Sequence, residues 1–242
     1  SVNSSMQAFE AGKAFGKFVS HLSDMEGPRL HETIPNFHNV RMRFDDFIKA
    51  MQKDRFNRAT NAAEEIKFFT EHEAIVRKLE KAISSGGLPE RITHNDTKFN
   101  NVLLDAETDK EQCVVDLDTV MPGNILYDFG DMVRTTTSPT MEDEMDLTKV
   151  KLRLPLFKAL ARGYLKSTKD ILTKKEKKLI AFSGKMMTFT IGLRFLTDYL
   201  SGDTYFRVHR PRHNLDRTRT QIKLIQSIEK QEDKMQAYVD SL

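Results

Sequence analysis

Two short polar clusters, each beside an apolar run, hold the residue types in this chain that could carry out chemistry. In the first cluster Asp96 follows His94 at a spacing of two, and Asn101 lies five residues after Asp96. The second cluster begins at Asp116, near the end of an apolar run. Carboxylate and amide oxygens are ligands that Mg²⁺ prefers in proteins, and a further carboxylate can accept the proton of a hydroxyl group. The combination is typical of metal-assisted phosphoryl transfer.

The apolar runs predict the element that would bring the two clusters together. Residues 102–104 and 114–115 are apolar, and a polar segment, 105–111, lies between them, which is the pattern of a β-hairpin. Closing this hairpin would place both clusters in one pocket. Lys98 lies two residues after Asp96, where a cation could offset the negative charge that develops on a transferred phosphoryl group.

Each of these residues taken alone has a simpler explanation, because aspartate often caps a turn and histidine often packs in a core. Their combined spacing is more informative, since it reproduces the HxDxxxxN pattern of a kinase catalytic loop. A further carboxylate, Asp128, lies in the segment YDFGD, twelve residues after Asp116. We therefore interpret residues 91–131 as a catalytic and metal-binding stretch.

Composition restricts the other classes of function. The 242 residues allow one large domain or two small ones, and a net charge of +3 gives no strong nucleic-acid signal. No run approaches the roughly 18 apolar residues of a membrane span, and no signal peptide opens the chain. The single cysteine, Cys113, excludes an internal disulfide and lies in an apolar run, where we expect it to be buried. We expect a cytoplasmic protein without a nucleic-acid or membrane partner, and the sequence leaves the oligomeric state open.

The spacing of apolar residues predicts a mostly helical fold of the α+β class with one or two small hairpins. Thr173 and Glu176 have the spacing of a capping box at the start of one helix. Residues 121–124 are typical of a turn, the acidic segment 142–146 of a solvated turn, and 201–210 of a loop or a pair of short strands. Helices are expected over residues 6–22, 43–51, 57–83, 125–135, 147–166, 174–200 and 214–239.

Residues 91–131 resemble the aminoglycoside phosphotransferase family, a branch of the protein-kinase-like fold. The resemblance rests on the blocks THNDTK at 93–98, VDLDTVMPG at 115–123 and DFGD at 128–131. It implies a kinase that uses ATP and Mg²⁺. It also implies a role for each site residue: Asp96 and Lys98 in catalysis, Asn101 and Asp116 as metal ligands, and His94 and Asp128 in bracing the catalytic loop.

Four further blocks narrow the resemblance to the N-acetylhexosamine 1-kinase branch of that family. They are ETIPNFHN at 32–39, KMMT at 185–188, RFLTD at 194–198 and HNLDR at 213–217. This branch implies transfer of the γ-phosphoryl group of ATP to the anomeric hydroxyl of N-acetylglucosamine or N-acetylgalactosamine, with Arg194 and Tyr205 contacting the sugar. The chain departs from the wider family at Asn95, where glycine is common, and in the TKFNN that follows Asp96.

The resemblance also implies a domain organisation. Residues 1–242 correspond to the helical C-terminal lobe of the kinase-like fold, with the catalytic loop and metal site at 91–131 and the sugar-site helices at 174–219. No glycine-rich phosphate loop is found in the chain. The family has an N-terminal nucleotide-binding lobe ahead of the point where this chain begins. We therefore expect the 242-residue chain alone to have little or no kinase activity.

Two alternative functions remain open from the sequence. The first is a kinase of another small molecule, such as a different sugar, choline or an aminoglycoside. The basic residues in 194–219 argue against a polycationic acceptor. The second is a catalytically silent sugar-binding domain, and the intact Asp96, Asn101 and Asp116 argue against it.

Overall fold

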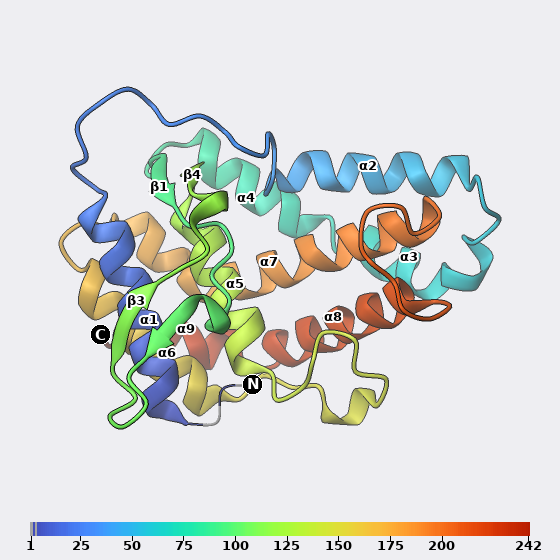
Figure 1. Cartoon of the computed structure of the whole chain (residues 1–242). Helices are drawn as coiled ribbons and strands as arrows, with labels where there is room; N and C mark the ends of the chain where they lie inside the picture. Colours follow the sequence, from blue (N-terminus) through green and yellow to red (C-terminus); the bar gives the residue numbers. More distant parts are fainter. Residues whose placement is uncertain (1, 3) are drawn as a thin grey trace.

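The computed structural model describes Val2 and residues 4–242, most of which lie in helices (Figure 1). The helices are α1 (Ser5–His21), α2 (Val40–Lys53), α3 (Ala63–Glu71), α4 (Ala74–Ser84), α5 (Ile125–Thr137), α6 (Leu154–Thr168), α7 (Lys174–Leu200), α8 (His213–Glu229) and α9 (Glu232–Asp240). The strands in the described residues are β1 (Arg91–Thr93), β2 (Val102–Leu104), β3 (Glu111–Val114) and β4 (Met121–Gly123). The predicted α+β, mostly helical class is confirmed.

Helix α7 is the centre around which other helices pack. At its start Thr173 Oγ1 accepts the N–H of Glu176 at 3.1 Å, and the Glu176 carboxylate accepts the N–H of Thr173 at 2.7 Å, which confirms the predicted capping box. Helices α2, α5, α8 and α9 all contact α7. Among the described helices, α7 alone is long and apolar enough to cross a membrane, a feature that the sequence prediction overlooked. However, 89% of its apolar window is buried inside the protein, which is the pattern of a core helix.

Helix α1 supports the catalytic stretch from one side. A Cβ atom added at Gly12 would lie 2.3 Å from the carbonyl oxygen of Leu160, and one at Gly163 would lie 2.1 Å from that of Phe9. Helices α1 and α6 therefore cross with their backbones in contact, which only glycine permits at these positions. This close packing fixes α1 beside β2 and β3, which it also contacts.

The four strands form two antiparallel pairs. Strand β2 pairs with β3, with Val102 opposite Val114, so the predicted hairpin is confirmed. Cys113 lies on an exposed face of β3, so the prediction that it is buried is wrong, because a two-stranded sheet leaves one face open to solvent. Strand β1 pairs with β4, which is drawn from residues predicted to form a turn; Thr93 lies opposite Met121. This second pair brackets residues 94–120, which include the catalytic loop and the β2–β3 hairpin.

Two predicted helices are broken in the structure. The expected helix 57–83 divides at His72, whose ring stacks on Phe68 and whose Nδ1 lies 2.7 Å from the carbonyl oxygen of Phe68. The expected helix 214–239 divides at Gln231, whose side chain donates to the carbonyl oxygen of Leu152 at 3.1 Å. In both cases a tertiary contact overrides a continuous helical pattern.

Helix α6 begins later than predicted. It starts at Leu154, and Pro155 lies in its first turn, where a missing N–H costs nothing. The preceding residues, Leu147–Lys149, form a single 3₁₀ turn instead of the start of the helix.

Candidate active site

Asp128, in the first turn of α5, holds the loop that follows β1. Its Oδ2 accepts the backbone N–H of His94 at 2.9 Å, and its Oδ1 accepts that of Asn95 at 2.7 Å. The hydroxyl of Thr97 donates to the carbonyl oxygen of Asp128 at 2.6 Å. Asp128 is 1% exposed, and burial raises the pKa of its carboxyl to about 6, although the two N–H donors act in the opposite direction. Three contacts therefore tie the loop to α5.

His94 links the loop to the strand that precedes Asp116. Its Nε2 lies 2.9 Å from the carbonyl oxygen of Val115, and its Nδ1 accepts the N–H of Asp96 at 3.3 Å. A carbonyl oxygen can only accept, so the proton of this ring is on Nε2. The ring is buried against Phe15 and Phe18 of α1, at centroid distances of 5.3 and 5.6 Å. His94 therefore joins α1, the loop and the end of β3.

Asn95 occupies the position at which the wider family commonly has glycine. Its φ is +64°, in the left-handed region that glycine and asparagine tolerate best. Its Nδ2 donates to the carbonyl oxygens of Thr93 and Thr119, each at 3.1 Å, and its Oδ1 accepts the hydroxyl of Thr93 at 3.1 Å. Asn95 therefore combines a backbone conformation that glycine also tolerates with hydrogen bonds that join β1 to the segment before β4.

Substitutions at Asn95 test this explanation. Asn95→Ala is expected to lower the free energy of unfolding by about 2–4 kcal/mol, because it adds left-handed strain and removes buried hydrogen bonds. Asn95→Gly removes the same hydrogen bonds without strain and should cost about 1–2 kcal/mol. Urea unfolding of both variants measures the difference. Equal losses would show that the backbone conformation at this position has no energetic consequence.

Asp96, Lys98 and Asn101 form one hydrogen-bonded group. Lys98 Nζ lies 2.8 Å from Asp96 Oδ1, and Asn101 Nδ2 donates to the carbonyl oxygen of Asp96 at 2.8 Å and to its Oδ2 at 3.3 Å. Burial lowers the pKa of Lys98, but the hydrogen bond and charge of Asp96, with the charge of Asp131, outweigh burial and raise that pKa above its ordinary value. No described residue donates to Asn101 Oδ1, which leaves this oxygen available to a ligand.

Asp116 lies two residues after the end of β3, and the intervening Val115 contacts Asn101. The N–H of Val115 donates to the carbonyl oxygen of Asn101 at 2.9 Å, so the hairpin brings the two predicted metal ligands together. Asp116 is in the left-handed region, with φ 66° and ψ 59°, and its side chain is exposed without a hydrogen-bond partner among the described residues. A non-glycine residue in this conformation is often found at a functional site.

Arg194 and Tyr205 lie in a different cavity, of about 190 Å³, whose lining includes none of the residues of the catalytic loop. Arg194 donates to the hydroxyl of Tyr205 at 3.1 Å. Residues 201–210 form a loop and not a strand pair. Asp198 organises this loop, because its carboxylate accepts the successive backbone N–H groups of Thr204, Tyr205 and Phe206 at 2.8, 2.8 and 2.9 Å.

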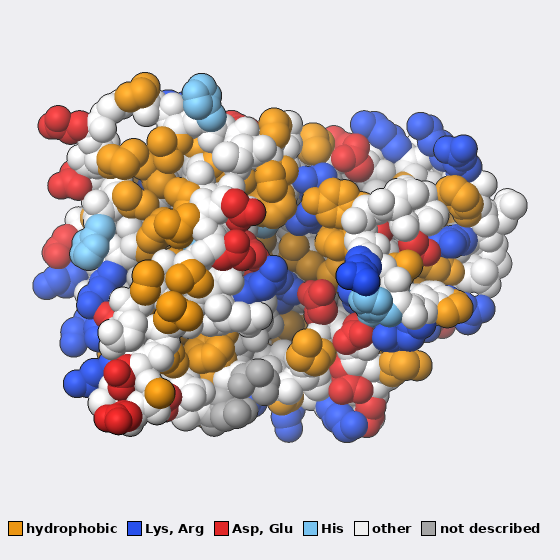
Figure 2. Space-filling view, viewed as in Figure 1, with side chains coloured by type: hydrophobic (Ala, Val, Ile, Leu, Met, Phe, Trp, Pro, Cys, Tyr) orange, Lys and Arg blue, Asp and Glu red, His pale blue; other side chains and the backbone are white. Residues whose placement is uncertain are grey.

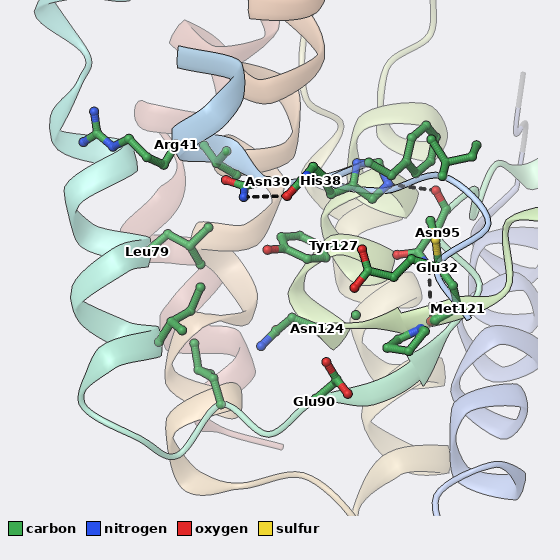
Figure 3. Close-up of a pocket in the computed structure, with 18 of the residues that line it drawn as sticks. Glu32, His38, Asn39, Arg41, Leu79, Glu90, Asn95, Met121, Asn124 and Tyr127 are labelled. Carbon is green, nitrogen blue, oxygen red and sulfur yellow. Dashed lines mark hydrogen bonds between the residues drawn. The ribbon is translucent and has the colours of Figure 1, made fainter. Parts of the chain in front are cut away.

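A cavity of about 320 Å³ lies between α4, α5 and the loop 30–39 (Figure 3). Figure 3 shows Asn124 and Tyr127 directed toward α4, where Leu79 lies. His38, on the opposite wall, is 2.9 Å from the carbonyl oxygen of Asn95 through its Nε2. Burial lowers the pKa of His38 to about 4, so the ring is neutral at physiological pH and its Nε2 donates. The block ETIPNFHN, which contains His38, was the only sequence signal for this contact.

The acidic segment 142–146 contains the predicted turn and is partly exposed, and two of its carboxylates also pair with basic residues. Asp143 accepts hydrogen bonds from Arg210 at 3.1 Å and pairs with His213 at 2.8 Å, and Glu142 pairs with Arg134 at 3.2 Å. Asp143 thereby pairs with Arg210 and His213 after α7, whereas Arg194 and Arg207 form no ion pair with a described residue.

Hydrophobic side chains cover part of the molecular surface near the candidate site. Figure 2 shows hydrophobic side chains gathered over the half of this face that carries α1 and the β2–β3 hairpin. Leu103 in β2 and Leu117, the residue after Asp116, are 51% and 53% exposed. The predicted metal ligands therefore lie next to an open apolar surface.

Comparison with known protein families agrees with this geometry. A family model described as "Phosphotransferase enzyme family" matches residues 5–160, which is more than half of the chain and contains α1, both strand pairs, α5 and the whole catalytic stretch. The match supports the predicted relation to aminoglycoside phosphotransferases at the level of the family. The chain belongs to the phosphotransferase enzyme family.

Proposed function

We propose that the protein is an ATP- and Mg²⁺-dependent kinase that phosphorylates the anomeric hydroxyl of an N-acetylhexosamine, N-acetylglucosamine or N-acetylgalactosamine. Membership of the family implies a phosphotransferase activity. The observation that carries the proposal is the hydrogen-bonded group around Asp96. Its carboxylate contacts Lys98 and Asn101, and His94 ties its backbone to the end of β3.

Asp96 is the proposed catalytic base. Its carboxylate would accept a hydrogen bond from the acceptor hydroxyl and take its proton as the new O–P bond forms. Lys98 contacts this carboxylate through a partly exposed side chain, so its ammonium group could also meet a phosphoryl oxygen and offset its charge. Most of the rate enhancement would come from positioning and charge neutralisation, without a covalent intermediate.

Asn101 and Asp116 fit the requirements of a Mg²⁺ site. Asn101 Oδ1 and the Asp116 carboxylate have no hydrogen-bond partner among the described residues, and both are hard oxygen donors. The described residues contain no group of three His, Cys, Asp or Glu side chains that could hold a metal alone. Mg²⁺ commonly completes its coordination with water and substrate phosphates, so two protein ligands suffice. Bound Mg²⁺ would neutralise the phosphate groups of the nucleotide.

We also propose that this chain is the helical lobe of a kinase-like enzyme and that nucleotide lies between it and a second lobe. The exposed Leu103 and Leu117 support this proposal, because an open apolar surface beside charged groups is typical of a covered or ligand-binding face. Arg194 and Tyr205 are the proposed sugar contacts. Arginine can form paired hydrogen bonds to hydroxyl and carbonyl oxygens, and the Tyr205 ring is 65% exposed.

A substrate panel tests the proposal. ADP release by the full-length protein would be measured with ATP and Mg²⁺ on N-acetylhexosamines, other sugars, choline and an aminoglycoside. We expect kcat/KM to be highest for an N-acetylhexosamine, and to fall when Mg²⁺ is chelated. Turnover confined to choline or the aminoglycoside would keep the family chemistry and discard the sugar. Sugar binding without any ADP release would instead indicate a silent binding domain.

A further inference from the structure

The cavity that contains Arg194 and Tyr205 has a second guanidinium group in its wall. It lies between the first turn of α2, the C-terminal part of α7 and the loop after Leu200, and it is lined by Arg43 as well as by Arg194. Figure 1 shows α2 running along the C-terminal half of α7, with this loop beside them. The cavity volume of about 190 Å³ is enough for a small chemical group.

Arg194 is held in place by aromatic rings and keeps most of its donors free. Its guanidinium carbon lies 5.0 Å from the centroid of Phe37 and 5.4 Å from those of Tyr205 and Phe206. Rings of this kind stabilise a cation through their faces but do not satisfy its N–H groups. Of the five N–H donors of an arginine, only one forms a hydrogen bond with a described residue, to the Tyr205 hydroxyl.

Arg43 also has N–H donors without hydrogen-bond partners among the described residues. Its terminal nitrogen donates to the carbonyl oxygens of Asn36 and Phe37, at 3.2 and 3.1 Å, and its Nε is buried without any partner. Neither Arg43 nor Arg194 forms an ion pair with a carboxylate of the described residues. Burial, and then repulsion by Arg43, lower the pKa of Arg194, with a further contribution from Arg134. The cavity therefore holds two guanidinium groups whose charges are not paired.

The carboxylates in the cavity wall are engaged elsewhere. Asp198 is 5% exposed, and its oxygens accept three backbone N–H groups of the loop and the side-chain amide of Asn214 at 2.8 Å. Asp46 lies 3.6 Å from Lys49 on its own helix. Neither carboxylate forms a hydrogen bond or ion pair with the two guanidinium groups. A ligand must therefore supply the acceptor oxygens that these groups lack.

We propose that this cavity binds an oxyanion group, a carboxylate, sulfate or phosphate, between Arg43 and Arg194. An oxyanion can accept several hydrogen bonds from the planar edge of a guanidinium, and two such groups would neutralise it. The hydroxyl of Tyr205 accepts from Arg194, so its own proton is free to donate to the same ligand. The proposal stands on the geometry of the cavity and goes beyond the proposed reaction.

Direct binding tests the site without any need for catalysis. Calorimetric titration with sulfate and with phosphate, at constant ionic strength and with chloride as reference, should show saturable binding. Arg43→Gln and Arg194→Gln should each weaken it by about tenfold or more, since each removes charged hydrogen bonds. Arg207→Gln is the matched control, because Arg207 is exposed on the same loop and does not line the cavity; it should bind as the unaltered protein does.

A second variant guards against misfolding of the arginine variants. Tyr205 is 65% exposed, so Tyr205→Phe removes only its hydroxyl and should fold normally while weakening anion binding several-fold. No saturable binding of sulfate or phosphate above the chloride reference would overturn the proposal. Equal binding by the Arg43→Gln and Arg207→Gln variants would overturn it as well, because it would indicate nonspecific charge attraction.

The bound oxyanion has two possible sources, a substituent on the sugar acceptor or a free ion. Binding of either one supports the proposed anion site. Only the test that distinguishes these two sources rests on the proposed function, because it requires turnover of a sugar. If the substituent binds there, a sulfated or carboxylated N-acetylhexosamine should have a lower KM than the neutral sugar, and Arg43→Gln should remove that difference. If a free ion binds, sulfate should bind while the substituent leaves KM unchanged. Absence of turnover would discard the proposed reaction and leave the binding result intact.

Discussion

Asp96→Asn is expected to lower kcat for phosphoryl transfer by about 10²–10⁴-fold, the usual contribution of a general base. The substitution keeps one side-chain oxygen for the hydrogen bonds from Lys98 and Asn101, which lie 2.8 and 3.3 Å from the carboxylate in the structure. An amide cannot accept a proton from the acceptor hydroxyl, so the chemical step slows while the geometry is retained. The KM for ATP should change little, because Asp96 is not a proposed metal ligand.

The measurement is steady-state ADP release by the full-length protein, with the acceptor that performs best in the substrate panel. Asp24→Asn is the matched control: Asp24 is exposed and forms no contact with the catalytic stretch, so its kcat should equal that of the unaltered protein. Urea unfolding of Asp96→Asn should give a free energy within about 0.5 kcal/mol of the original. A variant that folds normally and keeps its kcat would remove Asp96 from the role of base.

The β2–β3 hairpin of the catalytic stretch could be predicted because its signals are local. The apolar runs 102–104 and 114–115 flank a polar turn, and the structure forms the predicted hairpin with Val102 opposite Val114 and an irregularity between Leu103 and Leu104. The capping box at Thr173 is equally local, since both partners lie within one turn. Patterns of this kind depend on neighbouring residues alone, and so they survive in the folded protein.

Other features depend on contacts between distant residues and leave no pattern in the sequence. The break at His72 and the pairing of β1 with β4 are set by tertiary contacts, and residues 121–124 look like a turn when read alone. The pairing of Asp143 with Arg210 and His213 spans about 70 positions. The distribution of charged residues along the sequence could not show which basic residues would form ion pairs. The cavity that holds Arg43 and Arg194 likewise joins residues that lie far apart in the sequence.

Asp128→Ala is expected to lower the free energy of unfolding by about 2–5 kcal/mol, a loss comparable to that of a buried network. The buried N–H groups of His94 and Asn95 lose their acceptor, and the surrounding side chains cannot replace it. The catalytic loop would then be held to α5 by the Thr97 hydroxyl alone among these three contacts. Urea unfolding at pH 5 measures the loss, and Asp24→Ala, at an exposed site, should leave stability unchanged.

The pH dependence of stability gives an independent test of the same carboxyl group. The pKa of Asp128 is raised from 3.8 to about 6 in the folded state, so the folded protein holds this proton more tightly than the unfolded chain does. Its favourable contribution is complete below about pH 4 and is lost as pH rises to about 6, by roughly 3 kcal/mol in total. Asp128→Ala should lack this step. Parallel stability curves for the two proteins between pH 4 and pH 7 would contradict this prediction, because they would show that ionisation of Asp128 does not oppose folding. The contribution of Asp128 to stability would then come only from its hydrogen bonds to His94 and Asn95.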